Sequence, residues 1–281
     1  MKLRILLTAS AFLFSLSLIF PQTTVAEKLM SNDTTIAQFQ NSQLERAKTY
    51  LDRGFVYYNL AKYDLALTNY SKAIKINPNN DNAYYGRGLV YSKQGKNDLA
   101  LADFNRAIQI NPRNDNVYYG RGIIYADRGK SELALADYNK AIEINSENYA
   151  VYHNRGNYYL EKGKNDLALA DFDRAIQINP SDARVHFGRG VAFYKHGKCD
   201  LALSDYNEAI KINPNYASVY ANRGVIFYQK GKHNLAQVDL ENAKQLFSAK
   251  GDITSVNKVN RILRQLTQNQ NTQHFSLLTC K

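Results

Sequence analysis

Several residue types that carry chemistry are scarce in this chain. Its 281 residues include two cysteines, two methionines, five prolines and no tryptophan. Two cysteines are too few for a disulfide-built scaffold, or for a zinc or iron–sulfur site made of cysteines alone. Long apolar runs are also scarce, because a single one stands near the N-terminus, and this excludes a polytopic membrane protein. With 44% hydrophobic residues the chain still has enough apolar side chains for a folded core.

The single apolar run follows a short basic start. It covers residues 5–20 without a charge, and small residues stand just beyond it at Thr24 and Ala26. This order is typical of a secretory signal peptide, here residues 1–26. The run is shorter than the roughly 20 apolar residues that a membrane helix needs. We therefore expect an exported protein of the periplasm, the extracellular space or an equivalent lumen, with an uncleaved membrane anchor as the alternative.

The chain beyond this segment repeats with a period of 34 residues. Asn-Pro pairs begin at Asn77, Asn111, Asn179 and Asn213, and Asn145 keeps the register with Ser in place of Pro. Within each repeat the eighth place is always Gly, the eleventh is aromatic, and the twentieth and twenty-seventh are Ala. Such a period is the signature of stacked repeats. Six repeats occupy residues 47–80, 81–114, 115–148, 149–182, 183–216 and 217–250.

The spacing inside a repeat predicts two helices. In the second repeat, Tyr84, Gly88 and Tyr91 lie at the i, i+4, i+7 spacing of one helix face. The apolar residues of 100–107 show the same spacing, and Gly95 stands between the two segments, where a helix should end. A hairpin of this size cannot bury its apolar face alone, so we expect the repeats to stack into one continuous core.

This pattern resembles the tetratricopeptide repeat family, in an exported bacterial type, over residues 47–250. The resemblance implies an all-α fold, a right-handed superhelix (α-solenoid) of six 34-residue helix-turn-helix repeats. It also implies that the first helix of each repeat lines a concave groove.

The segments that flank the repeats differ from them in composition. An apolar stripe made by Val256, Val259, Leu263 and Leu266 predicts a capping helix over residues 251–267, which repeat arrays need for solubility. The Gln- and Asn-rich residues 268–281 are expected to be a disordered tail. Residues 27–46 are polar and are expected to be a linker, although Ile36, Phe39 and Leu44 could extend the first helix backwards.

An arginine stands at the seventh place of every repeat, where the family often has Leu. Five repeats also carry Asp at the twenty-third place, while the first repeat has Asn69. Because a buried Arg needs a partner, we interpret the two rows as Arg–Asp pairs between the helices of a repeat. A row of guanidinium groups that binds an anion is the alternative. The arginines are Arg53, Arg87, Arg121, Arg155, Arg189 and Arg223, and the aspartates are Asp103, Asp137, Asp171, Asp205 and Asp239.

No catalytic constellation, phosphate loop or metal-ligand spacing is present in the sequence, so we expect neither an enzyme nor a cofactor. His186 replaces a packing aromatic and is expected in the core; an approach to His153 of the neighbouring repeat is the less favoured alternative. Cys199 and Cys280 could pair with each other, link to another chain or stay free.

The expected function is that of a scaffold that binds another protein or an extended peptide in the groove. Some family members grip a C-terminal carboxylate through a Lys/Asn/Arg clamp, but here only Asn157 fits that clamp and His153 replaces its Lys. The family geometry places these residues in the groove: Lys48, Tyr58, Asn82, Tyr85, Lys93, Asn116, Tyr119, Asp127, His153, Asn157, Glu161, Arg184, Phe187, Tyr194, Lys195, Tyr228 and Gln229.

The distribution of charge argues against a nucleic-acid partner. The whole chain carries +11, but the third and fourth repeats carry −2 and −1 while the outer repeats are basic. A nucleic-acid groove would want a continuous basic stripe. A membrane is expected as a partner only if the N-terminal segment stays uncleaved. The alternative function is a carbohydrate- or cell-wall-binding module, because Tyr faces and Asn amides can also hold sugars.

Overall fold

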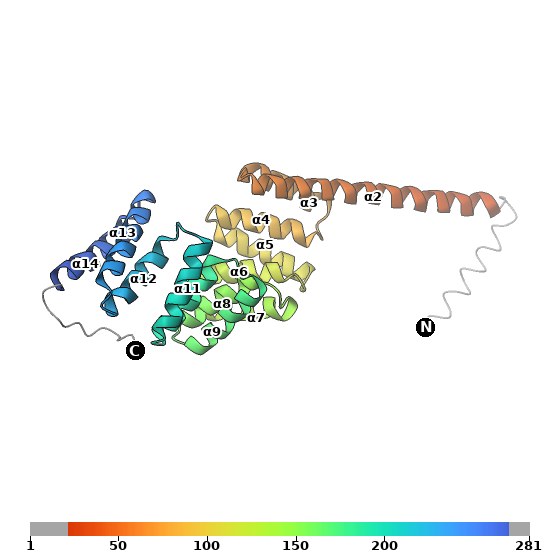
Figure 1. Cartoon of the computed structure of the whole chain (residues 1–281). Coiled ribbons are helices and arrows are strands. Elements are labelled where there is room, and N and C mark those ends of the chain that lie inside the picture. The colour runs from red at the N-terminus through yellow and green to blue at the C-terminus, as the bar shows by residue number, and fades with distance from the viewer. Residues whose placement is uncertain (1–21, 270–281) are drawn as a thin grey trace. The chain divides into compact units, whose positions relative to one another are not determined.

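The computed structural model describes residues 22–269, and in this range all regular structure is helical (Figure 1). The chain forms two compact bodies that divide after Pro112. The N-terminal body contains α2 (Gln22–Asn59), α3 (Tyr63–Ile76), α4 (Asp81–Lys93) and α5 (Asn97–Ile110). The C-terminal body contains α6 (Asp115–Asp127), α7 (Ser131–Ile144), α8 (Tyr149–Glu161), α9 (Asn165–Ile178), α10 (Ala183–Lys195), α11 (Cys199–Ile212), α12 (Ala217–Gln229), α13 (His233–Ala249) and α14 (Ile253–Asn269).

The helix pairs coincide with the sequence repeats, which confirms the all-α repeat fold. Each pair ends its first helix at a residue with positive φ, and this residue is Gly in the last five repeats, with φ between 69° and 76°. The first repeat has Ala61 there, with φ 54°. Left-handed backbone brings a Cβ close to the following carbonyl, so Ala61 is strained where glycine is not.

Replacing Ala61 by Gly should raise the free energy of unfolding by about 1 kcal/mol, because the left-handed conformation no longer opposes a side chain. Gly95→Ala in the next repeat is the matched control. Nothing lies within 4 Å of a Cβ built at Gly95, so Gly95→Ala meets backbone strain alone. It should lower the free energy of unfolding by the amount that Ala61→Gly raises it. Urea denaturation followed by circular dichroism measures both, and an Ala61→Gly variant less stable than the parent chain would contradict the strain.

The two helices of a repeat approach closely through glycine and an aromatic ring. A Cβ built on Gly88 would lie 2.6 Å from Cε1 of Phe104, and Phe104 is completely buried. Tyr84 and Tyr91 are only half-buried, since they flank the guanidinium group of Arg87 at 5.6 and 6.0 Å from their ring centroids. The aromatic places of the first helix therefore hold an arginine, in addition to filling the core.

The Arg–Asp pairs between the helices of a repeat are confirmed in the five repeats that have both residues. Arg155 is typical, because its Nε and Nη2 donate to the two carboxylate oxygens of Asp171 at 2.8 and 2.7 Å. Its Nη1 reaches back to Asn139 of the preceding repeat at 2.7 Å, so one side chain joins three helices. The other pairs are Arg87–Asp103, Arg121–Asp137, Arg189–Asp205 and Arg223–Asp239.

Helix α14 packs against α13 and covers the last repeat. Val259 and Leu266 are buried in the cluster that contains Leu240, and Leu263 packs against this cluster. The apolar stripe of the sequence thus faces the repeats, as a capping helix requires. The helix continues to Asn269, two residues past the expected boundary at 267.

The N-terminal flank is helical where the sequence analysis expected a polar linker. Residues 27–46 lie inside α2, whose 38 residues continue without a break into the first repeat. No Gly or Pro interrupts the chain between Val25 and Arg53, so nothing in the sequence stops the helix. Ile36 and Phe39 follow the helical spacing but stay largely exposed.

The outermost segments lie outside the described residues. Most of the expected signal peptide, 1–26, and most of the expected tail, 268–281, belong to them. The expected cleavage after Ala26 would fall inside α2. No helix between residues 22 and 269 has the length and hydrophobicity needed to cross a membrane.

Candidate functional site

The residues expected in the groove all lie on the first helices of the repeats, and none of them is fully buried. They form two groups by exposure. The charged residues and two of the asparagines are exposed: Lys48, Asn82, Lys93, Asn116, Asp127, Glu161, Arg184 and Lys195. The aromatic side chains and the remaining polar ones are half-buried: Tyr58, Tyr85, Tyr119, His153, Asn157, Phe187, Tyr194, Tyr228 and Gln229.

In the N-terminal body, three of these residues line one pocket of about 400 Å³ between α2 and α4. Tyr58, Asn82 and Tyr85 contribute to it, whereas Lys48 and Lys93 do not. The remaining lining is mainly apolar and includes Phe55, whose side chain is 60% exposed. The other lining residues are Leu51, Asp52, Tyr70, Gly86 and Leu89. A large apolar side chain of a partner would suit this pocket.

In the C-terminal body, hydrogen bonds link successive first helices along the same surface. Asn154 donates to the hydroxyl of Tyr119 at 3.1 Å, and Gln229 donates to the hydroxyl of Tyr194 at 2.7 Å. Lys195 donates to the carbonyl of Leu160 at 3.4 Å. Part of the predicted groove set therefore holds neighbouring repeats together.

The groove aromatics rest on the buried rings of the second helices. Phe187 lies 5.9 Å from Tyr206 and 5.1 Å from Tyr216, measured between ring centroids. Tyr119 lies 6.4 Å from Tyr138 in the same way. Tyr216 was not predicted from the sequence because it stands in the turn before α12, outside the helical spacing. Truncating one of these rings would therefore disturb packing as well as the surface.

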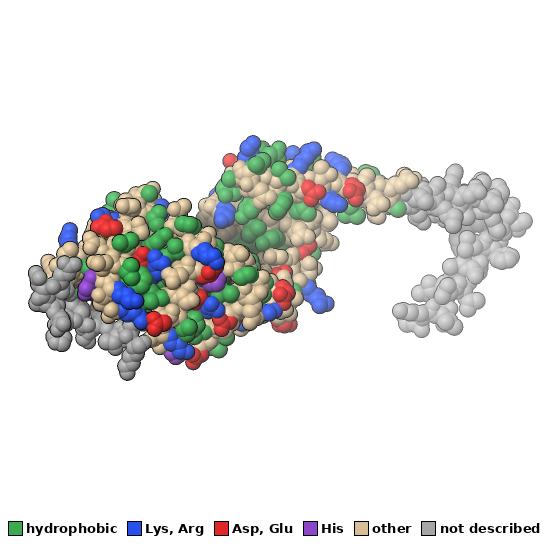
Figure 2. All heavy atoms as spheres, in the orientation of Figure 1, with side chains coloured by type: hydrophobic (Ala, Val, Ile, Leu, Met, Phe, Trp, Pro, Cys, Tyr) green, Lys and Arg blue, Asp and Glu red, His purple; other side chains and the backbone are tan. Residues whose placement is uncertain are grey.

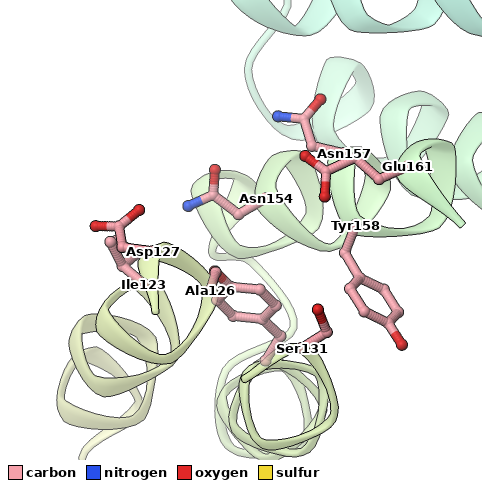
Figure 3. A pocket seen from close by; sticks show the side chains of 9 residues that line it. Ile123, Ala126, Asp127, Ser131, Asn154, Asn157, Tyr158 and Glu161 are labelled. Carbon is pink, nitrogen blue, oxygen red and sulfur yellow. The ribbon is translucent and has the colours of Figure 1, made fainter. Parts of the chain in front are cut away.

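A second pocket of about 170 Å³ lies where α6, α7 and α8 meet (Figure 3). It brings together Asp127, Asn157 and Glu161 of the predicted set, and it adds Ser131, Tyr138 and Asn154. Ile123, Ala126 and Tyr158 complete the lining. The side chain of Tyr158 is directed to Glu132, to which its hydroxyl donates at 3.1 Å. The pocket is thus polar and rich in acceptor oxygens.

His186 has the core position that the sequence analysis expected. It is 6% exposed, its Nε2 lies 2.9 Å from the carbonyl oxygen of Pro180, and its Nδ1 lies 3.4 Å from Oδ1 of Asp205. The hydrogen bond with Asp205 raises the pKa of His186. Burial lowers the pKa of His153 in the neighbouring repeat. Within residues that the structure describes, no three His, Cys, Asp or Glu side chains gather as a metal site would need.

The raised pKa of His186 predicts a pH-dependent stability. The protonated form is favoured in the folded state, so its contribution is complete below about pH 6.5 and is lost as the pH rises through the raised pKa. His186→Tyr, which restores the aromatic of the other repeats, removes this titration. The stability difference between the parent chain and the variant should fall as the pH rises above about 6.5. Thermal melts at a series of pH values on both sides of about 6.5 measure it, and a constant difference would contradict the prediction.

Cys199 begins α11 and is 1% exposed. It is disulfide-bonded, while Cys280 lies outside the described residues.

Charged side chains of both signs alternate with apolar ones over the face of the molecule in Figure 2.

Family comparisons agree with the repeat architecture. A family model described as TPR repeat matches residues 54–95, 156–197 and 193–231. Two further models are described as tetratricopeptide repeat. One matches residues 82–114 and 116–148, and the other matches residues 137–170. No curated protein matches the sequence.

Solved structures show the same fold at low identity. PilF of Pseudomonas aeruginosa superposes with a TM-score of 0.70 at 18% identity, covering 78% of this chain and 99% of that one. A tetratricopeptide repeat protein from Parabacteroides merdae gives 0.58 at 20% identity, covering 80% and 98%. YrrB, a TPR protein described as having an unusual peptide-binding site, gives 0.55 at 23% identity, covering 68% and 97%.

Proposed function

Because the chain belongs to the tetratricopeptide repeat family, we propose that it is a non-catalytic scaffold that binds a partner protein, or an extended segment of one, on the surface of its first helices. Repeat proteins of this kind use extended concave surfaces for binding. The observation that carries the proposal is the row of half-buried Tyr, Phe and Asn side chains with a pocket in each body.

The composition of this row supports a protein partner. Aromatic residues are enriched in protein interfaces, and Tyr adds a polar tip to a large apolar ring. Phe55 illustrates the point, because it is 60% exposed beside an apolar pocket instead of being buried. The related fold of YrrB, with its peptide-binding site, agrees with such a role.

The N-terminal segment supports a place outside the cytoplasm. A basic start, an apolar run and small residues before residue 27 are the parts of an export signal. Assembly or trafficking of an envelope or lumenal complex is therefore the task that we propose for the scaffold.

Affinity capture from an extract of the source organism tests the proposal. The full chain is the bait, and the groove variant combines Phe55→Ala with Asn116→Ala, two exposed side chains on first helices. The matched control combines Leu99→Ala with Leu133→Ala, which are about half exposed on second helices. A protein retained by the parent chain and the control, but lost by the groove variant, would support the scaffold.

Equal retention by all three baits would contradict binding at this surface. A parallel arm uses insoluble cell-wall polysaccharide in place of the extract. Retention on the polysaccharide that depends on Phe55 and Asn116, with no protein captured, would favour the carbohydrate-binding alternative instead.

A further inference from the structure

The pocket between α6, α7 and α8 contains two carboxylates in equivalent places of neighbouring repeats. Asp127 is the last residue of α6, and Glu161 is the last residue of α8. Helix C-termini carry partial negative charge, so carboxylates there are unfavourable. The same place holds Lys93 and Lys195 in the repeats on either side, where the charge complements the helix end. Only the third and fourth repeats place acids here, and they do so at the expense of helix stability.

Neither carboxylate is neutralised by another described side chain. No salt bridge to Asp127 or Glu161 forms among residues 35–268, and both side chains are exposed at the pocket rim. Lys195, on the next first helix, donates instead to the carbonyl of Leu160. Figure 3 shows the two acids on opposite sides of the pocket, with the asparagines of α8 between them.

The buried wall of the pocket includes a phenol. Tyr138 lines the pocket, is 2% exposed, and is held by Tyr119 and by the close approach of Gly122. No other side chain of the described residues hydrogen-bonds its hydroxyl, which lies at the pocket wall and is open to a ligand there. Burial raises the pKa of Tyr138, and the nearby negative charges, Asp127 and Glu161 among them, raise it further. The hydroxyl therefore stays protonated and available at neutral pH.

The asparagines complete a set of acceptors. The amide nitrogen of Asn154 donates to Tyr119, and that of Asn157 lies 3.2 Å from Nε2 of His153. The amide oxygen of Asn157 is left as an acceptor beside the two carboxylates, whereas Asn154 also forms a hydrogen bond with His153. Asn157 also departs from its repeat place, because the ninth place is apolar in the other repeats: Phe55, Leu89, Ile123, Val191 and Val225.

We propose that this pocket binds the cationic side chain, Lys or Arg, of the partner segment. Two carboxylates, the amide oxygen of Asn157 and a phenol oxygen offer acceptors to an ammonium or guanidinium group, which carries only donors. The inference rests on the proposed function and adds the chemistry of one residue of the partner. Charge complementarity of this kind selects a partner and its register.

Nuclear magnetic resonance titration of the full chain tests the inference. The probes are capped tripeptides, acetyl-Gly-X-Gly-amide, in which X is Lys, Arg, norleucine or Glu. The Lys or Arg probe should shift the side-chain amide signals of Asn154 and Asn157 in a saturable way. The norleucine and Glu probes should leave them unchanged. A response to Lys alone or to Arg alone identifies the group, and no response to either overturns the inference.

Two variants separate the pocket from the rest of the surface. The double variant Asp127→Asn with Glu161→Gln should weaken binding of the cationic probe at least tenfold. It should also raise the melting temperature, because the helix ends lose unfavourable charge. Tyr138→Phe keeps the ring but removes the hydroxyl, and it should weaken binding of the probe several-fold. Asp166→Asn, an exposed acid outside the pocket, should leave probe binding unchanged and should lower the melting temperature slightly, because Asp166 lies in the first turn of α9. Unchanged binding in the Asp127/Glu161 variant would overturn the inference.

The capture experiment distinguishes failure of this inference from failure of the proposed function. A partner that is lost with the Phe55/Asn116 variant but retained at full strength with the Asp127/Glu161 variant leaves the scaffold standing and overturns the cation pocket. A partner that both variants lose supports both proposals.

Discussion

Replacing Asp171 by Ala should lower the free energy of unfolding by about 3 kcal/mol, because it leaves Arg155, whose side chain is 18% exposed, without its carboxylate. Arg155 is held by both oxygens of Asp171 and lies between Tyr152 and Tyr159, with its centre 5.6 and 5.8 Å from the two rings. The Asp171 side chain is 7% exposed, so water cannot take its place easily. Only Asn139 would remain as a hydrogen-bond acceptor for the guanidinium.

Matched changes test this account of the Arg–Asp pair. Asp173→Ala also removes one ion pair, with Arg189, but its side chain is 51% exposed, so the loss should stay below about 1 kcal/mol. Asp171→Asn should be milder than Asp171→Ala, because the first repeat already accommodates Asn69, whose amide donates to the carbonyl of Leu65 at 2.7 Å. Denaturation with urea measures the loss of stability in all three variants. Equal losses for Asp171→Ala and Asp173→Ala would show that the pair is dispensable.

Replacing Phe172 by Ala should cost about 4 kcal/mol, the largest single effect that we expect in the core. The ring is completely buried and fills the space over two glycines, one on each side. A Cβ built on Gly156 or Gly188 would lie 2.9 or 2.8 Å from its Cε1. Gly156 belongs to the same repeat and Gly188 to the next, so the cavity would open within a repeat and at its junction. Neither glycine has a side chain that could fill it.

The control variants for Phe172 come from the repeat pattern. Phe172→Tyr should be nearly neutral, because Tyr70, Tyr138 and Tyr206 occupy the corresponding place. Leu167→Ala on the same helix should lose less than about 1 kcal/mol, because its side chain is 49% exposed. The melting temperature and the urea midpoint report the differences. A Phe172→Ala variant no less stable than Leu167→Ala would contradict the shared-core interpretation.

A repeat place has the same residue type along the chain, but not the same burial. Val56 is 53% exposed, whereas Val90 and Ile226 at the corresponding place are completely buried. The sequence shows no difference between them, because the covering surface belongs to a preceding repeat that the first repeat lacks. For the same reason Arg53 stays exposed while Arg87 and its later counterparts reach back to a neighbour.

The candidate pocket was visible from the sequence only in part. Asp127, Asn157 and Glu161 were expected at the groove because they occupy groove places on first helices. Tyr138 was not, because its place is that of a core aromatic, and only the structure shows its hydroxyl at the pocket wall. The acidic charge of the third and fourth repeats was a signal, but it did not say which acids come together.

The amino-acid sequence by itself determined the period, the helix pairs, the Arg–Asp partners and the capping helix. These features depend on spacing within one repeat or between adjacent helices, where 3.6 residues per turn fix which side chains share a face. The tertiary structure decided which residues of different repeats meet, how far each is buried and which polar groups stay unpaired. These depend on how closely neighbouring repeats pack, and that distance is set jointly by all the side chains at the junction.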